Sequence, residues 1–476
     1  MSSIDDTIQT VLKIEKDHDT SKLLIRGVNY WPILRRNVYF SLVRSRHAPK
    51  KYSTYQKMLD YVFSVLRYSK LKWSNRHRLV RKKYLIFSYS TFRRNKIDGK
   101  WFDAYSDSLR IRENIVWESI HIEYPQRGIF KKPTYESTYY LNPIIVFYAK
   151  LKTRLRKSID LKNDVLQKVI TTFDSIGYHT SIRAVHHEYY EILEYSKYFS
   201  KMLAKVEPQA VFVTGYSMNL SMGLLHACKK LKIDTYEIQH GSIFPNNPIF
   251  SNWTKIQDGG YYFLPKHFLV WDKAIKEHIN KTNLPSHYHE AIYYGNSYHY
   301  IYNHQMLSYS PYEERFKKRI KMESRTIILF CLGRDDIEEW VYDTIENDSN
   351  LWLLRAHPGL GNYEALSKSP NLSRLIRMEH VFFEEPYNAT LSFLLRISDL
   401  LVAYNSTTIL EAIEYGLPTI AIEKASKTYF RVQIDEGKTV LCLNQKDLII
   451  AIMQNKSKKS GNIHDQHYET WVGKYQ

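Results

Sequence analysis

Three polar clusters in the second half of the sequence each follow an apolar run of the kind that forms a buried strand. They are Gly333-Arg334, the segment Arg355 to His357, and the turn Asn405-Ser406-Thr407. Strand-like runs alternate here with helix-like segments, so we expect a parallel sheet whose strand ends meet at one edge. A guanidinium, an imidazole and a turn rich in hydroxyl and N–H groups suit a phosphate or diphosphate held without a metal ion.

The third cluster sits inside a stretch that can be explained in two ways. Residues Leu400 to Ile422 show an apolar run, a polar turn, a short helical segment and a second apolar run. A turn that opens a helix above a sheet offers free N–H groups and the positive end of the helix dipole to an anion. Thr408 and Glu411, followed by Gly416, also fit a capping box and a glycine stop. The capped helix leaves Asn405-Ser406-Thr407 without a role, so both interpretations stay open at this point.

His240 is the candidate for chemistry in the first half of the chain. It ends a strand-like run and precedes Gly241, and a glycine lets the backbone turn sharply and approach a ligand closely. The imidazole could then act as an acid, a base or a phosphate ligand. Glu237 lies three residues earlier, and strand alternation predicts that it faces the other way. If His240 is only a structural residue at a tight turn, Asp107 and Asp258 are the next candidates.

Alternating strand-like and helix-like segments must position these residues. A chain of 476 residues indicates two domains of roughly 200 residues each. The alternation is clear from Ala210 and again from Thr326, and the helical stretches 158–176 and 182–206 should cover the first sheet. The expected fold class is α/β with two doubly wound Rossmann-like domains. We expect a basic, partly amphipathic helical region at 1–80, one such domain at 81–300, a linker at 301–325, the second domain at 326–455 and a tail at 456–476.

The composition is that of a folded globular protein, with 44% hydrophobic and 14% aromatic residues. The three cysteines, Cys228, Cys331 and Cys442, have no spacing typical of zinc or of a disulfide framework, which favours a reducing compartment. The sequence has no run of about 18 apolar residues and begins with a polar, acidic segment, so we expect neither a membrane-spanning helix nor a secretory signal. The expected location is the cytoplasm.

A formal net charge of +19 predicts an anionic partner. Between Asp60 and Asp98 the chain has eleven lysines and arginines and no acidic residue; we call this interval the basic segment. Its apolar residues have roughly helical spacing, which fits an amphipathic helix on the anionic inner leaflet of a membrane. A solvated basic face of a helix packed on its own domain explains the charges as well. No RNP, KH or zinc-finger motif is present, so we expect no nucleic acid partner.

Four stretches resemble one group of enzymes. The motifs EIQHG and RAHP and the stretch AYNSTTILEAIEYGLPTI resemble bacterial capsule and lipopolysaccharide glycosyltransferases of the GT-B architecture, and the loop FSYSTFRRNKIDGKWFDAYSD is similar to the amino-terminal part of some of them. The HP and Ser/Thr pair is similar to motifs with which bacterial sialyltransferases and Kdo transferases hold CMP-sugars. QHG and HP also resemble the two histidines of CDP-glycerol polymerases. The resemblance implies two Rossmann-like domains that face a cleft, with the acceptor on the first and the nucleotide-sugar on the second.

The resemblance also implies roles for single residues. His357 and Ser406-Thr407 would contact the donor phosphate, Glu411 the ribose, and His240 the reacting centre. The expected donor-binding set is Gly333, Arg334, Arg355, His357, Asn405, Ser406, Thr407 and Glu411.

The sequence departs from these families at the general base. The acidic-acidic-glycine motif of some sialyltransferases is not evident in the first domain, where Asp258-Gly259-Gly260 is only approximate. Asp435-Glu436-Gly437 has the right letters but follows the nucleotide half. The one Asp-x-Asp, Asp17-His18-Asp19, lies in the polar N-terminal segment and fits a solvated helix face better. We therefore predict no metal and no cofactor.

Together these features predict a glycosyltransferase that moves a sugar from a nucleotide-activated donor to a growing cell-surface polysaccharide or lipopolysaccharide. A CMP-linked ulosonic acid is the favoured donor and a UDP-sugar the second choice, with a glycan or a lipid-linked molecule as acceptor. The enzyme would be peripheral at the inner face of the plasma membrane. The alternatives are a CDP-alditol phosphotransferase of teichoic-acid-like polymers, a non-catalytic basic protein that binds membrane or RNA, and an epimerase that converts a free UDP-sugar.

Overall fold

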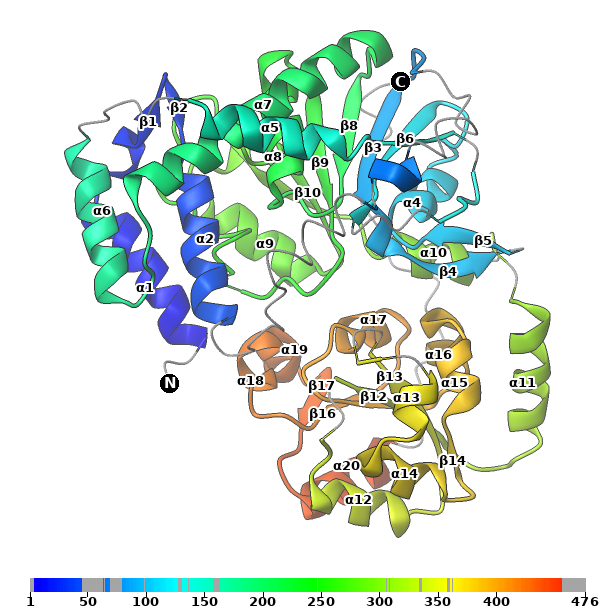
Figure 1. Ribbon diagram of the computed structural model, residues 1–476. Coiled ribbons are helices and arrows are strands. Elements are labelled where there is room, and N and C mark those ends of the chain that lie inside the picture. The colour runs from blue at the N-terminus through cyan, green and yellow to red at the C-terminus, as the bar shows by residue number, and fades with distance from the viewer. Residues whose placement is uncertain are drawn as a thin grey trace. The chain divides into compact units, whose positions relative to one another are not determined.

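The computed structural model describes residues 4–44, 63, 65–68, 79–97, 99–126, 131–135, 137–156, 163–245, 247–304, 306–307, 309–333, 336–357, 360–361 and 363–455. The chain divides into two compact units, the first comprising Met1–Tyr294 and the second beginning at Gly295. Each unit is built on a parallel sheet flanked by helices (Figure 1).

The first unit contains a seven-stranded sheet in the order β11-β10-β9-β8-β3-β6-β7, in which every neighbouring pair is parallel. Its strands are β3 (Tyr84–Tyr89), β6 (Ser119–Tyr124), β7 (Thr138–Tyr140), β8 (Ala210–Val213), β9 (Asp234–Ile238), β10 (His267–Val270) and β11 (Glu290–Tyr293). The sheet grows from β3 in one direction and from β8 in the other, which is the doubly wound order. Ligands of such sheets bind at the carboxyl ends of the two strands where the order reverses, here β3 and β8.

Helices cover this sheet through apolar contacts. Every residue of β3 and β8 is buried, as expected for parallel strands covered on both faces. The predicted helix 182–206 is α7 (Ile182–Val206), capped by the Ser181 side chain. It packs closely on α8 (Asn219–Lys230) at Gly223, where a Cβ would lie only 2.5 Å from the Tyr195 Cβ.

The N-terminal helices belong to the first unit. The other helices of this unit are α1 (Ile4–Asp17), α2 (Trp31–Arg44), α4 (Ser106–Arg112), α5 (Ile144–Arg154), α6 (Asp164–Ser175) and α9 (Lys273–Thr282), and two antiparallel pairs are β1 (Leu24–Ile25) with β2 (Val28–Asn29) and β4 (Arg93–Ile97) with β5 (Lys100–Asp103). Arg35 of α2 is buried, pairs with Glu15 of α1 at 2.9 Å and donates to the carbonyl oxygens of Ser251 and Asn252. This buried arginine anchors α1 and α2 to the rest of the unit.

The second unit contains a six-stranded sheet in the order β14-β13-β12-β15-β16-β17, again parallel throughout. Its strands are β12 (Ile327–Leu332), β13 (Leu351–Ala356), β14 (Val381–Phe382), β15 (Leu400–Ala403), β16 (Thr419–Ala421) and β17 (Thr439–Leu441). Counted in chain order, the arrangement is 3-2-1-4-5-6, the order of the dinucleotide-binding Rossmann fold. The order reverses between β12 and β15.

Two hydrophobic clusters lie on the two faces of this sheet. Alternate residues of β12 divide between them, with Ile328 and Phe330 in one and Leu329 and Cys331 in the other. The covering helices are α12 (Glu339–Glu346), α13 (Tyr363–Ser367), α14 (Pro370–Ile376), α15 (Glu384–Asn388), α16 (Leu391–Ile397), α17 (Thr408–Glu414), α18 (Ser426–Tyr429), α19 (Arg431–Asp435) and α20 (Gln445–Asn455).

Two helices precede the second sheet, α10 (Ser297–Asn303) and α11 (Pro311–Lys321). Helix α11, which falls within the segment 301–325 that we expected to be a linker, begins at a capping box formed by Ser310 and Glu313. The Glu313 carboxylate also accepts hydrogen bonds from the backbone N–H and the hydroxyl of Thr390. This segment is therefore tied to the start of α16.

The basic segment is described only in part, at residues 63, 65–68 and 79–97. Arg93 is fully buried and pairs with Asp107 and Glu123. Arg81 lies 2.5 Å from Glu207, and Lys83 lies 3.8 Å from Glu118. Acidic partners that are distant in sequence thus neutralise part of a segment that has none of its own.

The predicted fold class is confirmed, because the chain is α/β and contains two Rossmann-like units. All three cysteines are free and buried. None of the helices in the described ranges is both long and apolar enough to cross a membrane.

Candidate functional site

The carboxyl edge of the second sheet brings the three predicted clusters together. Leu332 pairs with Ala356 on one side, and Cys331 pairs with Ala403 on the other. If these registers continue, Gly333 lies between His357 and Asn405, about 5 Å from each backbone. The clusters therefore meet where the strand order reverses, which is the usual ligand position in such sheets. Arg334 lies outside the described residues.

This edge is open at His357 and Gly333. Both residues are exposed, and the His357 backbone N–H donates to the Leu332 carbonyl oxygen at 2.9 Å. A Cβ at Gly333 would lie 3.7 Å from the Tyr404 Cβ. The imidazole of His357 therefore stands at a strand end that a ligand can reach.

The turn after β15 is not the capping box that its letters suggested. Thr407 is the N-cap of α17 and makes no side-chain cap. The Ser406 hydroxyl lies 3.0 Å from the Thr408 hydroxyl and accepts from the Thr408 backbone N–H at 3.3 Å. The capping-box interpretation, one of the two left open, does not hold because Thr407 already has helical dihedral angles and is the N-cap, so that Thr408 is the first residue of the helix rather than its cap. The Asn405 N–H is also engaged, since it donates to the Glu423 carboxylate at 3.1 Å.

Glu411 points to a partner that sequence reasoning missed. Its carboxylate lies 3.6 Å from Nε2 of His299 on α10 and 3.4 Å from the amide nitrogen of Asn296. On its other side, His299 Nδ1 lies 2.9 Å from the Ser392 hydroxyl and 3.1 Å from the Tyr415 hydroxyl. The Glu411 side chain is 12% exposed, so a ribose hydroxyl would have to share this carboxylate with His299.

Arg355 is engaged by the protein itself. Its guanidinium Nη1 donates to the carbonyl oxygens of Pro386 and Tyr387, each at 2.6 Å. These carbonyls belong to the last turn of α15, where a cation is favourable. Burial lowers the pKa of Arg355. One arm of the guanidinium therefore stabilises α15.

In the first unit, His240 forms a pair with Glu237. The His240 Nδ1 lies 3.3 Å from the Glu237 carboxylate, which is buried and accepts the backbone N–H groups of Gly215 and Tyr216 at 3.0 Å each. We expected Glu237 to face away, which is wrong because β9 ends at Ile238 and strand alternation does not continue to His240. Burial raises the pKa of Glu237, and His240 and the two N–H groups oppose that shift.

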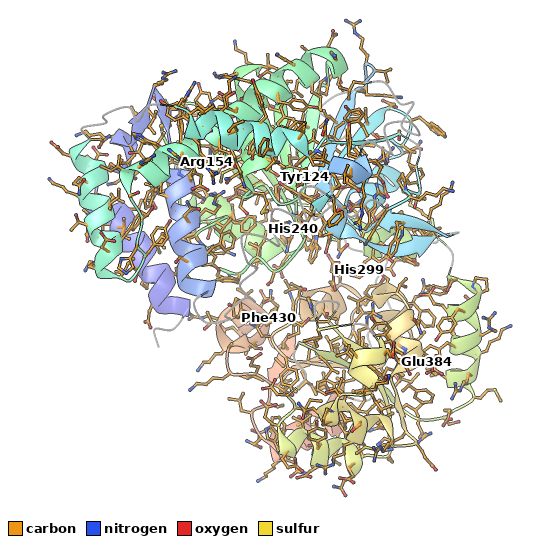
Figure 2. All side chains as sticks on the ribbon, in the orientation of Figure 1. Tyr124, Arg154, His240, His299, Glu384 and Phe430 are labelled. Carbon is orange, nitrogen blue, oxygen red and sulfur yellow. The ribbon has the colours of Figure 1, made fainter. Side chains whose placement is uncertain are left out.

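The backbone around His240 is fixed from several sides. The Tyr105 hydroxyl donates to the His240 carbonyl oxygen at 3.1 Å, and the side chain is 31% exposed although its Nδ1 is buried. We expected Gly241 to provide the turn, but its φ is not in the left-handed region. The residue that uses glycine's freedom is Gly215, with φ +82°, where a Cβ would lie 3.9 Å from His240 Cε1. Figure 2 labels His240 and Tyr124, the last residue of β6.

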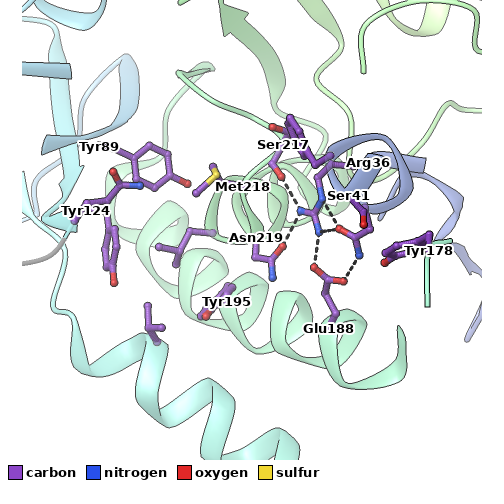
Figure 3. A pocket seen from close by; sticks show the side chains of 15 residues that line it. Arg36, Ser41, Tyr89, Tyr124, Tyr178, Glu188, Tyr195, Ser217, Met218 and Asn219 are labelled. Carbon is purple, nitrogen blue, oxygen red and sulfur yellow. Dashed lines mark hydrogen bonds and ion pairs between the residues drawn. The ribbon is translucent and has the colours of Figure 1, made fainter. Parts of the chain in front are cut away.

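A pocket of about 520 Å³ lies in the first unit (Figure 3). Its aromatic walls are Phe40, Tyr89, Tyr124, Tyr178 and Tyr195. Tyr89 and Tyr124 end β3 and β6, so the pocket lies at the carboxyl edge of the first sheet. A Cβ at Gly215 would lie 3.7 Å from the Tyr89 ring and 3.9 Å from His240. The pocket wall and His240 are therefore neighbours across Gly215.

The polar end of the pocket is held by Arg36. Its Nη1 donates to the Ser217 carbonyl oxygen at 2.6 Å and to the Asn219 side chain at 2.7 Å, and its Nη2 pairs with Glu188 (Figure 3). Asn37 contacts both Arg36 and Glu188. Sequence analysis could not find this pocket, because its lining comes from segments between positions 36 and 220 that share no motif.

A second buried cluster contains ligand types for a metal. Oxygen and nitrogen atoms of Asp103, His121 and Glu123 lie within 4.8 Å of one another. Arg93 occupies their midst, with Nη2 3.0 Å from His121 Nδ1 and Nε bonded to Glu123. A second cation there would be repelled by this guanidinium, so we interpret the cluster as a charge network of the protein.

The alternative acidic residues are less suitable than His240. Asp107 is fully buried between Arg93 at 2.9 Å and Arg110 at 3.3 Å, where no substrate reaches it. Asp258 is exposed, but the glycines after it form a structural turn. A Cβ at Gly260 would lie 2.8 Å from His289 Nε2.

Comparison with known proteins finds similar solved structures but no matching sequence family. No protein-family model and no curated protein sequence matches it. Among solved structures, the UDP-GlcNAc 2-epimerase of Methanocaldococcus jannaschii is similar, with 13% identity over 81% of this chain and 94% of that chain and a TM-score of 0.47. The wall teichoic acid polymerase TagF is similar with 12% identity over 91% of each chain and a TM-score of 0.41.

A ugt transferase from Siraitia grosvenorii, solved in complex with UDP, is similar with 10% identity over 80% of this chain and 92% of that chain, and a TM-score of 0.41. Likenesses at these identities and scores carry no argument about activity. The fold assignment rests on the strand orders of the two sheets.

The buried charge network predicts a pH dependence of stability. Burial raises the pKa of Glu123 to about 7, against the opposing pull of Arg93 and with a further rise from Asp103. Between its ordinary pKa and about 7 the folded state keeps a proton that the unfolded state has lost, so this residue's contribution to stability falls as the pH rises. The free energy of unfolding of the wild type, minus that of Glu123→Gln, should therefore fall between roughly pH 4.5 and 7.

Chemical denaturation of both proteins across this range measures the difference. Buried His226 and His289, whose pKa values are lowered by burial to about 4 and about 3, add a slope of opposite sign but are common to both proteins. A difference that is flat or rises with pH contradicts the prediction.

Proposed function

We propose that this chain is a glycosyltransferase that uses a nucleotide-activated sugar, with a CMP-linked ulosonic acid favoured and a UDP-sugar next, to extend a cell-surface polysaccharide or lipopolysaccharide. The observation that supports this most is the carboxyl edge of the second sheet, where Gly333, His357 and the Ser406 turn follow strands around the point at which the strand order reverses. Glycan extension would take place in the cytoplasm, at the inner face of the plasma membrane.

The second unit would hold the donor. His357 is exposed at the end of β13, and the Ser406 hydroxyl caps the turn after β15. An imidazole and a hydroxyl on either side of an open strand end suit the phosphate of the donor. Glu411, in the following helix, would bind a ribose hydroxyl by exchanging part of its contact with His299. In this proposal the protein groups alone neutralise the phosphate, without a metal ion.

The first unit would hold the acceptor and the base. Aromatic walls such as Tyr89 and Tyr124 provide apolar faces for sugar rings, and the amide and charged groups at the other end provide hydrogen bonds.

The chemistry proposed for His240 depends on its contact with Glu237. In this proposal the Glu237 carboxylate, 3.3 Å from Nδ1, keeps the proton on that nitrogen, so that Nε2 is the nitrogen that accepts a proton. It would take the proton of the acceptor hydroxyl while that oxygen forms the new bond to the anomeric carbon. The bond from this carbon to the donor phosphate breaks, and its electron pair leaves with the phosphate. Glu237 would then stabilise the imidazolium, as a carboxylate that orients a histidine does.

Two related chemistries use the same groups. His240 and His357 would also suit a phosphotransferase that adds alditol phosphate from a CDP-alditol, whose product contains phosphodiester visible by phosphorus NMR. An epimerase would convert a UDP-sugar with no acceptor present. A non-catalytic basic protein would bind anionic vesicles or RNA and no nucleotide-sugar.

The function is tested with a panel of CMP-, UDP-, GDP- and CDP-linked donors. We expect calorimetric binding of at least one nucleotide-sugar, and transfer of its sugar to a glycan or lipid-linked acceptor. If no member of the panel binds or is turned over, the proposal is wrong. Phosphodiester in the product, or conversion of a UDP-sugar alone, would replace it with one of the two related chemistries.

The donor site is tested by His357→Ala and Ser406→Ala. Each removes a charge-assisted or hydroxyl contact to phosphate, so donor affinity should fall about ten- to a hundredfold. His304→Ala, an exposed histidine of the same unit, is the matched control and should bind normally. Unchanged affinity in both site variants would leave the turn with a purely structural role.

The reacting centre is tested by His240→Ala. Loss of a general base should lower turnover by roughly a hundredfold or more while donor affinity is kept. Glu237→Gln should also lower turnover, since it removes the charge that stabilises the imidazolium. The control is His179→Ala, an exposed histidine of the first unit. Turnover of His240→Ala within a few-fold of wild type means that the base lies elsewhere.

A further inference from the structure

Helix α5 carries a row of large apolar side chains that are exposed to solvent. Ile144, Phe147, Tyr148, Leu151 and the following Leu155 are all exposed, with Phe147 at 51%, Tyr148 at 58% and Leu155 at 76%. Their spacing of three and four residues places them on one face of the helix. We call them the α5 stripe. Single exposed apolar residues are ordinary, but a contiguous stripe indicates a surface that contacts something else.

The opposite side of α5 faces the protein. Ala149 and Thr153 are buried, and α5 lies along α7 in the first unit (Figure 1). Between these two sides, Val146 lines the aromatic pocket. The helix therefore has one face fixed to the unit, one edge at the pocket and one apolar face exposed.

Basic side chains flank the α5 stripe. Lys150 and Arg154 follow helical positions on one side of it and Lys152 on the other, and α5 contains no acidic residue. Lys150 and Arg154 are exposed, and Figure 2 labels Arg154 at the end of the helix. Lys152 lies 3.4 Å from Glu194, so the first two provide most of the uncompensated charge. Apolar residues between cations match an anionic lipid surface, where headgroups lie beside acyl chains.

We propose that α5 is an interfacial helix that docks the first unit on an anionic lipid bilayer. Its 11 residues span about 16 Å, far less than the roughly 30 Å of a hydrocarbon core, so the helix lies in the membrane plane. The α5 stripe enters the boundary of the acyl chains, and Lys150 and Arg154 contact lipid phosphates. This location deepens the proposed function, because an acceptor anchored in lipid would reach the pocket past Val146.

This inference differs from the expectation based on the basic segment. In that segment Arg93 is buried and Arg81 and Lys83 have acidic partners. Electrostatic attraction alone would also disappear at high salt. A docking surface with an apolar stripe predicts a component of binding that survives salt.

The test measures binding of the full chain to vesicles made of equal parts phosphatidylglycerol and phosphatidylcholine, with no nucleotide or sugar present. Phe147→Glu/Leu151→Glu should weaken vesicle binding by roughly tenfold or more, because two apolar side chains that would enter the bilayer become charged. Lys150→Gln/Arg154→Gln should weaken binding and reduce its salt dependence. The matched control, Ile449→Glu/Met453→Glu, changes two exposed apolar residues of α20 in the second unit and should bind as wild type does.

A second readout reports the position of the helix. Emission of a tryptophan in Phe147→Trp, measured against the same protein without the substitution, should be quenched by brominated lipid. Unchanged vesicle binding of Phe147→Glu/Leu151→Glu overturns the proposal. If the two proteins bind vesicles equally, and sedimentation shows that the wild type self-associates while this variant is monomeric, the proposal is also overturned. The α5 stripe would then be a contact between copies of the chain. The assay contains no donor, so its outcome is independent of whether the chain transfers a sugar.

Discussion

The structure depends on one constraint of parallel sheets, which is that their strands must be joined by crossovers. In each unit the crossovers run outward in one direction and then in the other, so the order reverses once, at β3 and β8 and at β12 and β15. Sheets of this kind usually bind their ligands at the carboxyl ends of the strands at that point. The polar clusters of the second unit and the aromatic pocket of the first both lie there, although their residues share no sequence pattern.

Buried charges add a second level of organisation to the first unit. Glu237 is inaccessible to solvent and holds two backbone N–H groups besides His240. A buried carboxylate is stable only when its oxygens are satisfied, so the loop after β8 and the turn after β9 must keep their positions together. Arg93 likewise pairs with the buried carboxylates of Asp107 and Glu123. The position of His240 is thus a consequence of burial at Glu237.

At the carboxyl edge of the second sheet, much of the polar surface is engaged by the protein itself. Several groups that could meet a phosphate already have protein partners, as in the Asn405 N–H with Glu423 and Arg355 with the end of α15. His357 is exposed at the end of β13, and the Ser406 hydroxyl lies in the turn after β15, where it contacts Thr408. Glu411 with His299 joins this edge to α10. A donor bound at this edge would therefore contact a few specific groups within an otherwise satisfied frame.

Periodicity and turn residues are local properties, so sequence analysis predicted the α/β class with two Rossmann-like domains, helix α7, and polar residues that follow strands at His240, His357 and Ser406. Tertiary structure alone decided which side chains meet. The Glu237–His240 pair depends on where β9 stops, the Glu411–His299 pair joins residues more than a hundred positions apart, and the pocket collects segments from Arg36 to Leu220. Arg93 belongs to the basic segment, which we expected to form a basic surface, but its side chain is fully buried. Contacts of this kind depend on packing between distant elements, which no local pattern encodes.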